Sequence, residues 1–311
     1  MSFASFSRIS RRSFAAGALG VAAAALTASK SLAQATPAAQ ASPVAAADAP
    51  LVRIEYVGGF RPLEYYILQT PSLLVYPDGT VIQPAPVVAI YPPAAITPFN
   101  TFTISEAATS NLIERAIAAG LDEPQELIRD DVMDATTATI SVMLDGKAVT
   151  STVYALDVNG PKPESWDSDT MNLYVAIQEF ANFARNMAIS LDAEDIVAPE
   201  TPYVPNRLEL IAFEPDAAEP LSSGIPDLTA QPLIWPLDDS LSEIGAVYER
   251  VAGYGLPETR CVEITGDDAA EVIAGADTGN LVSPWQDGDK SYGVFINPLF
   301  PGESSCRDYP L

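Results

Sequence analysis

The sequence contains no histidine among its 311 residues. Imidazole is the commonest general acid or base near neutral pH and the commonest protein ligand of metals. Its absence excludes Ser-His-Asp and Cys-His nucleophile systems, and it excludes zinc, copper and haem centres ligated by histidine. Catalysis through paired carboxylates stays open, because two such groups can share the acid and base roles.

Cysteine is almost as scarce, with only Cys261 and Cys306 in the chain. Two cysteines are too few for an iron-sulfur cluster or a four-cysteine zinc site. In an oxidising compartment we expect the two to pair, closing residues 261 to 306 into a loop. The chain-entropy model gives such a bridge about 3–4 kcal/mol of stabilisation. The alternative is two buried free thiols.

Basic residues are few. The first 47 residues hold four of the 16 lysines and arginines and no acidic residue, which leaves 12 basic against 41 acidic residues and a charge of −29 for the rest. Such a surface repels phosphate backbones and anionic lipid headgroups, so we expect no nucleic-acid partner. The carboxylates are scattered, which also fits a simple role in solubility.

Several catalytic and nucleotide-binding motifs are missing. The chain has no G-x-S-x-G, S-x-x-K, P-loop or G-x-G-x-x-G sequence. Esterase, lactamase and nucleotide-binding functions therefore have no local motif to support them. We expect no cofactor.

What the sequence does contain begins at the N-terminus. Arg11 and Arg12, with Phe14 two places later, resemble the S-R-R-x-F core of a twin-arginine export signal. An apolar run over 15–26 and small residues over 31–35 complete the pattern of a signal peptide at 1–35. The alternative is an uncleaved anchor, but the run is shorter than the ~20 apolar residues of a spanning helix.

The resemblance implies transport by the twin-arginine translocase. It places the protein in the periplasm, the cell wall or the extracellular space, with no stable membrane span in the mature form. Residues 36–50 are rich in Ala, Pro, Ser and Thr and carry one charge. This composition is typical of a disordered spacer.

The remaining chain predicts an α+β fold with two small modules, at 51–197 and 198–311, each built from antiparallel hairpins packed on amphipathic helices. In the first, strand patterns surround turns at 77–79 and 145–146, and a helix follows Ser105 and stops at Gly120. A second helix is predicted over 169–189. The proline-rich stretch 84–98 indicates an edge strand or surface loop.

Three stretches carry a resemblance that covers residues 52–189. "YPDGTV" (76–81), "ISEAATSNLIERAIAAGL" (104–121) and "TATISVMLDGKAVTSTVY" (137–154) resemble a bacterial domain of unknown function found in exported proteins. "RIEYVGGF" (53–60) is similar to the start of emfourin-type metalloprotease-inhibitor domains. The second resemblance implies a secreted protease inhibitor. Neither implies a catalytic residue.

The second module follows a proline-rich boundary at 198–207. Strand patterns at 207–213 and 290–300 flank a strand-helix pattern at 259–279. "RLEL" (207–210) echoes "RIEY" (53–56), and the strand-helix patterns of the two modules echo each other. A decayed tandem duplication would produce such echoes.

Short acidic clusters are candidate calcium sites, because carboxylate oxygens suit hard cations. The candidates are Asp167, Asp169, Asp287 and Asp289, with a further cluster at 192–195. None continues as an EF-hand loop. The alternative makes Asp169 a helix N-cap and places 287–289 in a hairpin turn.

Asp277-Thr278-Gly279 matches the D-T-G of aspartic proteases, but the chain has no second copy. The competing interpretation is a helix end capped by Gly279. Trp166, Trp235 and Trp285 could bind sugars or peptides, although tryptophan more often seals a small core.

Taken together, these patterns predict an exported protein that recognises a protein or glycan by surface contact and has no enzymatic activity. The alternatives are a secreted protease inhibitor, a histidine-independent carboxylate hydrolase and a calcium-dependent adhesin. Folding before export would protect β-rich modules, whose long-range pairings form slowly.

Overall fold

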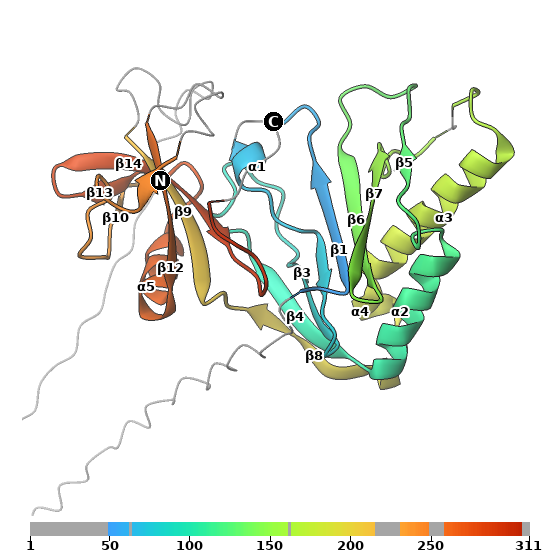
Figure 1. The fold of residues 1–311 in the computed structure, drawn as a ribbon. Helices are drawn as coiled ribbons and strands as arrows, with labels where there is room; N and C mark the ends of the chain where they lie inside the picture. The colour runs from blue at the N-terminus through green and yellow to red at the C-terminus, as the bar shows by residue number, and fades with distance from the viewer. Residues whose placement is uncertain (1–48, 62–63, 161–162, 215–230, 249–257, 307–311) are drawn as a thin grey trace, which may run out of the picture. The chain divides into compact units, whose positions relative to one another are not determined.

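The computed structural model describes residues 49–61, 64–160, 163–214, 231–248 and 258–306 (Figure 1). The expected signal peptide at 1–35 and nearly all of the expected spacer at 36–50 lie outside these ranges. Residues 42–311 form one compact unit by their internal contacts. Within it, helices accompany two mixed sheets, which confirms the α+β class.

The first sheet has eight strands in the order β5-β7-β6-β1-β2-β3-β4-β8. Every neighbouring pair is antiparallel except β5 and β7. The strands are β1 (Val52–Val57), β2 (Leu73–Val75), β3 (Thr80–Pro84), β4 (Phe99–Ile104), β5 (Glu126–Leu127), β6 (Thr137–Leu144), β7 (Lys147–Tyr154) and β8 (Ile196–Tyr203).

Both hairpin turns predicted in this module are confirmed. Between β6 and β7, Asp145 (φ 50°) and Gly146 (φ 74°) both adopt positive φ, as a two-residue type I′ turn requires. Between β2 and β3, Gly79 has φ 81°, and a Cβ there would collide with the carbonyl oxygen of Ile104. Only glycine fits that position.

Helices α2 (Glu106–Ala118), α3 (Ser168–Arg185) and α4 (Met187–Ser190) pack on one face of this sheet. Ser105 caps α2 as predicted, and Gly120 follows it with φ 78°. On α2, Leu112 is buried, whereas Ile117 is 44% exposed. The helix predicted over 169–189 is interrupted at Asn186. Two shorter elements are α1 (Glu64–Ile67) and the 3₁₀ helix η1 (Ala193–Asp195).

The opposite face of the sheet carries its own apolar cluster, because successive strand residues point to opposite faces. Val75 and Val81 face the helices, whereas Leu74 and Ile82 belong to the second cluster. Phe300, from the C-terminal part of the chain, belongs to the same cluster. Its ring lies edge-on to that of Phe99, with the ring centroids 4.8 Å apart.

The second sheet has six strands in the order β10-β13-β14-β9-β12-β11, with α5 (Gly266–Ala276) against it. The strands are β9 (Arg207–Phe213), β10 (Leu233–Ile234), β11 (Ala246–Val247), β12 (Thr259–Thr265), β13 (Trp285–Asp287) and β14 (Lys290–Pro298). Trp235 and Trp285 pack edge to face in its core, with centroids 5.6 Å apart. Trp166 packs on Tyr174 in the first core.

Strand β8 pairs with β4, so the first sheet extends to Tyr203, past the expected module boundary between 197 and 198. The tandem duplication stays a prediction. The strand before α5, β12, pairs directly with β9, whereas the strand before α2, β4, is separated from β1 by two strands. In the ranges that the structure describes, no helix is both long enough and apolar enough to cross a membrane.

Candidate functional site

The predicted disulfide is confirmed. Cys261 on β12 is bonded to Cys306, with their Cα atoms 5.7 Å apart. The bond fastens the segment that follows β14 to the second sheet. Cys261 itself is buried in a small apolar cluster with Ile211 and Phe295.

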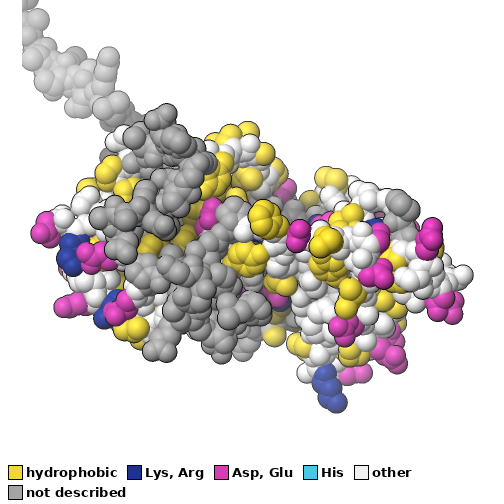
Figure 2. All heavy atoms as spheres, turned by 90° about the horizontal axis from the view of Figure 1, so that it is seen from above, with side chains coloured by type: hydrophobic (Ala, Val, Ile, Leu, Met, Phe, Trp, Pro, Cys, Tyr) yellow, Lys and Arg dark blue, Asp and Glu magenta, His cyan; other side chains and the backbone are white. Residues whose placement is uncertain are grey.

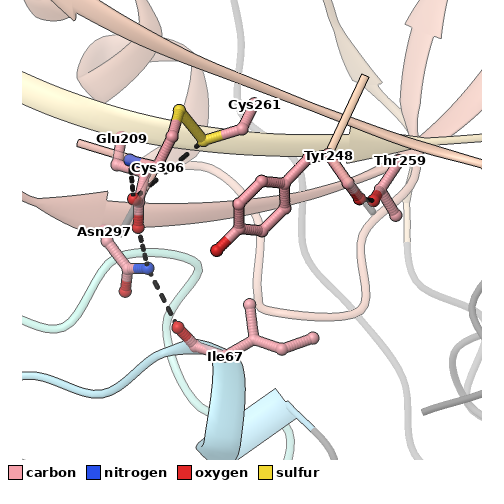
Figure 3. The surroundings of a disulfide bond; sticks show 7 residues. All are labelled: Ile67, Glu209, Tyr248, Thr259, Cys261, Asn297 and Cys306. Atoms are coloured by element: carbon pink, nitrogen blue, oxygen red, sulfur yellow. Dashed lines mark hydrogen bonds between the residues drawn. A yellow bond between two sulfur atoms is a disulfide. The ribbon is translucent and has the colours of Figure 1, made fainter. Parts of the chain in front are cut away.

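A buried carboxyl group lies beside this disulfide (Figure 3). Glu209 on β9 is completely buried. Its Oε1 accepts a hydrogen bond from the backbone N–H of Cys306 at 2.5 Å, and its Oε2 accepts one from Asn297 Nδ2 at 2.8 Å. The same Nδ2 donates to the carbonyl of Ile67, at the end of α1. The carboxyl group thus links the second sheet to α1 through neutral donors.

In the described part of the chain, one group of three residues that could ligate a metal comes together: Glu209, Cys261 and Cys306. Their ligand atoms lie within 4.8 Å of one another. Both sulfurs are consumed by the disulfide, so this arrangement offers no thiolate. A disulfide sulfur also carries no hydrogen, and the 4.0 Å approach of Cys261 Sγ to Glu209 Oε1 is a packing contact.

Two of the calcium candidates, Asp167 and Asp169, lie at the start of α3. Asp167 is the N-cap, and its Oδ1 accepts the backbone N–H of Thr170 at 2.8 Å. This hydrogen bond lowers the pKa of Asp167. Asp169 lies in the first turn of the helix, so its alternative interpretation as the N-cap is wrong, because Asp167 holds that position.

Of the other two candidates, Asp287 is the last residue of β13, and Asp289 lies in the turn to β14, where Gly288 has φ 61°. Asp287 Oδ2 accepts hydrogen bonds from Ser240 Oγ at 2.7 Å and from Leu241 N at 2.9 Å. Within the cluster at 192–195, Asp195 accepts from Ser105 Oγ at 2.7 Å. Asp287 and Asp195 thus have protein donors, and calcium binding at these clusters stays a prediction.

The D-T-G triplet follows helix α5, and Asp277 is the C-cap. Gly279 does not adopt positive φ, so its predicted role as a left-handed cap is wrong. A Cβ at Gly279 would lie 2.7 Å from Leu233 Cδ1. Close packing of Leu233, rather than helix capping, explains the glycine.

The connection between β3 and β4 carries a run of exposed apolar side chains. We call residues 85–93 the apolar loop. Val87, Val88 and Ile90 are 66%, 79% and 67% exposed, and Tyr91 is 43% exposed. No charged residue lies in the segment. Contiguous apolar side chains held in water mark interaction sites more often than isolated ones do.

Both ends of the apolar loop are tied to the body of the protein. The N–H of Ala85 donates to the carbonyl of Pro98 at 2.9 Å, closing the base of the loop. At the other end, the carbonyl of Pro93 accepts from Leu281 N at 2.9 Å, and Ala94 forms a β-bridge with Asn280. The exposed residues therefore project from a fixed base.

Local contacts also order the tip of the loop. The N–H of Ile90 donates to the carbonyl of Val88 at 2.9 Å. The Tyr91 hydroxyl donates to Glu64 Oε1 at 3.2 Å, and desolvation together with the Glu64 charge raises the pKa of this tyrosine. The Tyr91–Pro92 peptide bond is cis.

A pocket of about 320 Å³ adjoins the start of the loop. Its walls come from the end of β3, the loop, α4 and β8, and they include Gln83, Pro84, Pro86, Ala188, Ile189 and Glu200. Most of the lining is apolar. The elements that meet here are far apart in the sequence, so the sequence alone carried no signal for the pocket.

Glu200 supplies the negative charge of the pocket. Its Oε1 accepts hydrogen bonds from Gln83 Nε2 at 3.3 Å and from Asn100 Nδ2 at 3.0 Å. Both donors are neutral amides. Among the described residues, no lysine or arginine forms an ion pair with Glu200.

Arg185 also lines the pocket, but its guanidinium group contacts Asp157 and Tyr56. Nη2 lies 2.8 Å from Asp157 Oδ1, and the group stacks over the Tyr56 ring at 5.0 Å from its centroid. On the face shown in Figure 2, acidic side chains are scattered between apolar ones, and basic side chains are few.

Comparison with known proteins gives no relative: no family model, no curated protein and no solved structure matches this chain. The resemblances of residues 52–189 and of the N-terminal segment therefore stay predictions.

Proposed function

We propose that this chain is an exported protein that acts by recognising a protein partner, and that the apolar loop is its main contact surface. The carrying observation is the set of exposed aliphatic side chains on a loop tied at both ends. Burying apolar surface contributes about 25 cal/mol per Å². A loop already held in place loses little further conformational entropy on binding.

The export part of the proposal rests on the twin-arginine resemblance of Arg11 and Arg12. The disulfide between Cys261 and Cys306 is compatible with an oxidising compartment. A protein partner is favoured over a glycan because Val87, Val88 and Ile90 offer only aliphatic contacts. Glycan recognition draws on polar groups and aromatic faces, and the loop has one aromatic residue, Tyr91.

Charging the tip of the loop tests the proposal. We expect Val88→Asp to weaken partner binding at least about tenfold, because a carboxylate would have to be desolvated in an apolar contact. The partner is first captured with the full chain from the exported fraction of the source organism. Its dissociation constant is then measured for both proteins by calorimetry.

Ile234→Asp is the matched control, since Ile234 is 73% exposed on β10 in the second sheet. Both variants should melt at the temperature of the unmodified protein, because both side chains are solvated. Equal affinity of the Val88→Asp variant and the unmodified chain would refute the proposal.

Protease inhibition is a second candidate, and the tied loop favours it together with the emfourin-type resemblance. A fixed, exposed loop is a shape that an enzyme cleft can receive. Titration against secreted metalloproteases should then give stoichiometric inhibition that Val88→Asp abolishes. The pocket does not favour the hydrolase alternative, because its lining holds one carboxylate, Glu200, instead of a facing pair.

A further inference from the structure

We propose that the pocket beside the apolar loop receives a lysine side chain of the partner, with the ammonium group at Glu200 and the aliphatic stem against the apolar walls. The inference rests on the proposed function and names the chemistry of the partner.

The charge of the pocket selects a cation. Glu200 receives hydrogen bonds from two neutral amides, and within the described residues no cation pairs with it. Hydrogen bonds from neutral donors leave the negative charge in place. A ligand that brings a positive charge to this carboxylate gains a charge-assisted hydrogen bond, which is stronger than a neutral one.

The walls select an aliphatic stem. Pro84 and Pro86 have no backbone N–H to offer, and the side chains of Ala188 and Ile189 are purely apolar. Ile189 is 84% exposed, so covering it removes apolar surface from water. Lysine combines four methylene groups with a terminal ammonium that donates three hydrogen bonds and accepts none. Such side chains bury their stems along apolar surface and keep the charge at the rim.

The surroundings favour a lysine-rich partner. Arg185 does not oppose a second cation strongly, because Asp157 neutralises it. Residues 48–311 carry a formal charge of −29, which attracts cationic surfaces and speeds their encounter. Pro86 joins the pocket to the apolar loop directly. A partner that places apolar residues on the loop can therefore place a neighbouring lysine in the pocket.

The first experiment separates charge from hydrophobicity. The full chain, labelled at isoleucine δ1 methyl groups, is titrated with n-pentylammonium chloride and, separately, with 1-pentanol. We expect a saturable shift of the Ile189 methyl signal with the amine and a weaker response with the alcohol. The Ile234 methyl signal, from an exposed position on β10, should not move. Equal responses to the two probes, or no saturable shift, would overturn the inference.

The second experiment removes the charge. Glu200→Gln should weaken pentylammonium binding about two- to fivefold, the range of a surface ion pair, because Glu200 is exposed. Glu271→Gln, at an exposed position on α5, is the matched control and should leave the titration unchanged. A Glu200→Gln protein that melts normally and binds the amine as well as the unmodified chain would contradict the assignment of Glu200.

The third experiment tests lysine within a peptide. Acetyl-Val-Lys-Val-amide should bind more tightly than pentylammonium to the unmodified chain, and Val88→Asp should remove that advantage. Equal affinities would mean that the pocket takes free alkylamines, which overturns the lysine assignment. Loss of partner capture in Val88→Asp alongside unchanged amine binding in Glu200→Gln would sink this inference and leave the proposed function standing.

Discussion

The carboxyl group of Glu209 shows how single residues are accommodated in this protein. A completely buried carboxyl group is costly unless hydrogen bonds satisfy it. Here the backbone of Cys306 and the side chain of Asn297 both donate to it. These two donors, one at the disulfide and one on β14, explain how a carboxyl group can be buried on strand β9.

We expect Glu209→Gln to lower the free energy of unfolding by about 1–3 kcal/mol. An amide has one acceptor oxygen, so its N–H₂ group would face one of the two donors and leave it unsatisfied. Urea denaturation followed by circular dichroism measures the loss. Glu271→Gln serves as control and should stay within about 0.5 kcal/mol of the unmodified protein. A similarly small change for Glu209→Gln would show that the network is unimportant.

The ion pair between Arg207 and Glu263 predicts a specific pH dependence. The two side chains lie 2.7 Å apart across β9 and β12, and the hydrogen bond from Arg207 lowers the pKa of Glu263. The unfolded chain therefore takes up the proton first as the pH falls. The stability from this pair is present above the unfolded pKa of about 4.3 and is lost as the pH drops through the lower, folded pKa.

The difference in unfolding free energy between the unmodified protein and Glu263→Gln should thus be constant above about pH 5 and shrink below it. Its plateau should be below about 1 kcal/mol, because both side chains are partly exposed. Urea titrations at a series of pH values measure it. A difference that grows on acidification would contradict the assignment.

At the scale of elements, local chemistry predicted the hairpins and helix starts, and tertiary context decided the rest. Asp145, Gly146 and Gly79 adopt positive φ, which few residue types favour. Their turns can therefore be predicted from the sequence. The break after α3 was missed because Asn186 lies within an apolar repeat. Its side chain donates to the carbonyl of Asn182 at 2.7 Å and competes with the helical pattern.

Strand β8 was missed for a different reason. Its prolines, at 199 and 202, indicate a linker, yet β8 is the last strand of the sheet, where missing N–H groups are tolerated on the open side. The candidate site was likewise only partly predictable from the sequence. Prolines marked 84–98 as a surface loop, whereas the pocket joins segments that only the fold brings together.

The start of α2 gives a prediction for an element. Ser105 Oγ accepts the N–H of Ala108 at 3.0 Å and donates to Asp195 at 2.7 Å. Ser105→Ala should cost about 1 kcal/mol of stability, because one helix-end donor loses its acceptor. Ser105→Thr keeps a capping hydroxyl and should recover most of it. Thermal denaturation of the unmodified protein and the two variants measures these differences. Equal melting temperatures would exclude a capping role for Ser105.

At the scale of the whole molecule, the disulfide is the main covalent constraint. Its loop spans a sequence separation of 45 residues. On the chain-entropy model, opening it should cost about 4 kcal/mol. We expect a reducing agent to lower the urea midpoint of the unmodified protein and to have no effect on the Cys261→Ser/Cys306→Ser double variant. A midpoint unchanged by full reduction would show that the bridge does not stabilise the fold.

Because its base is closed, the apolar loop is a suitable position for displaying inserted peptides. The connection between β3 and β4 is closed at its base by the hydrogen bond from Ala85 N to the carbonyl of Pro98. Each doubling of the length of a flexible insertion costs only about 0.6 kcal/mol in closure entropy. Foreign sequences grafted at Ala89 would thus be presented to solvent while strands β3 and β4 keep their register.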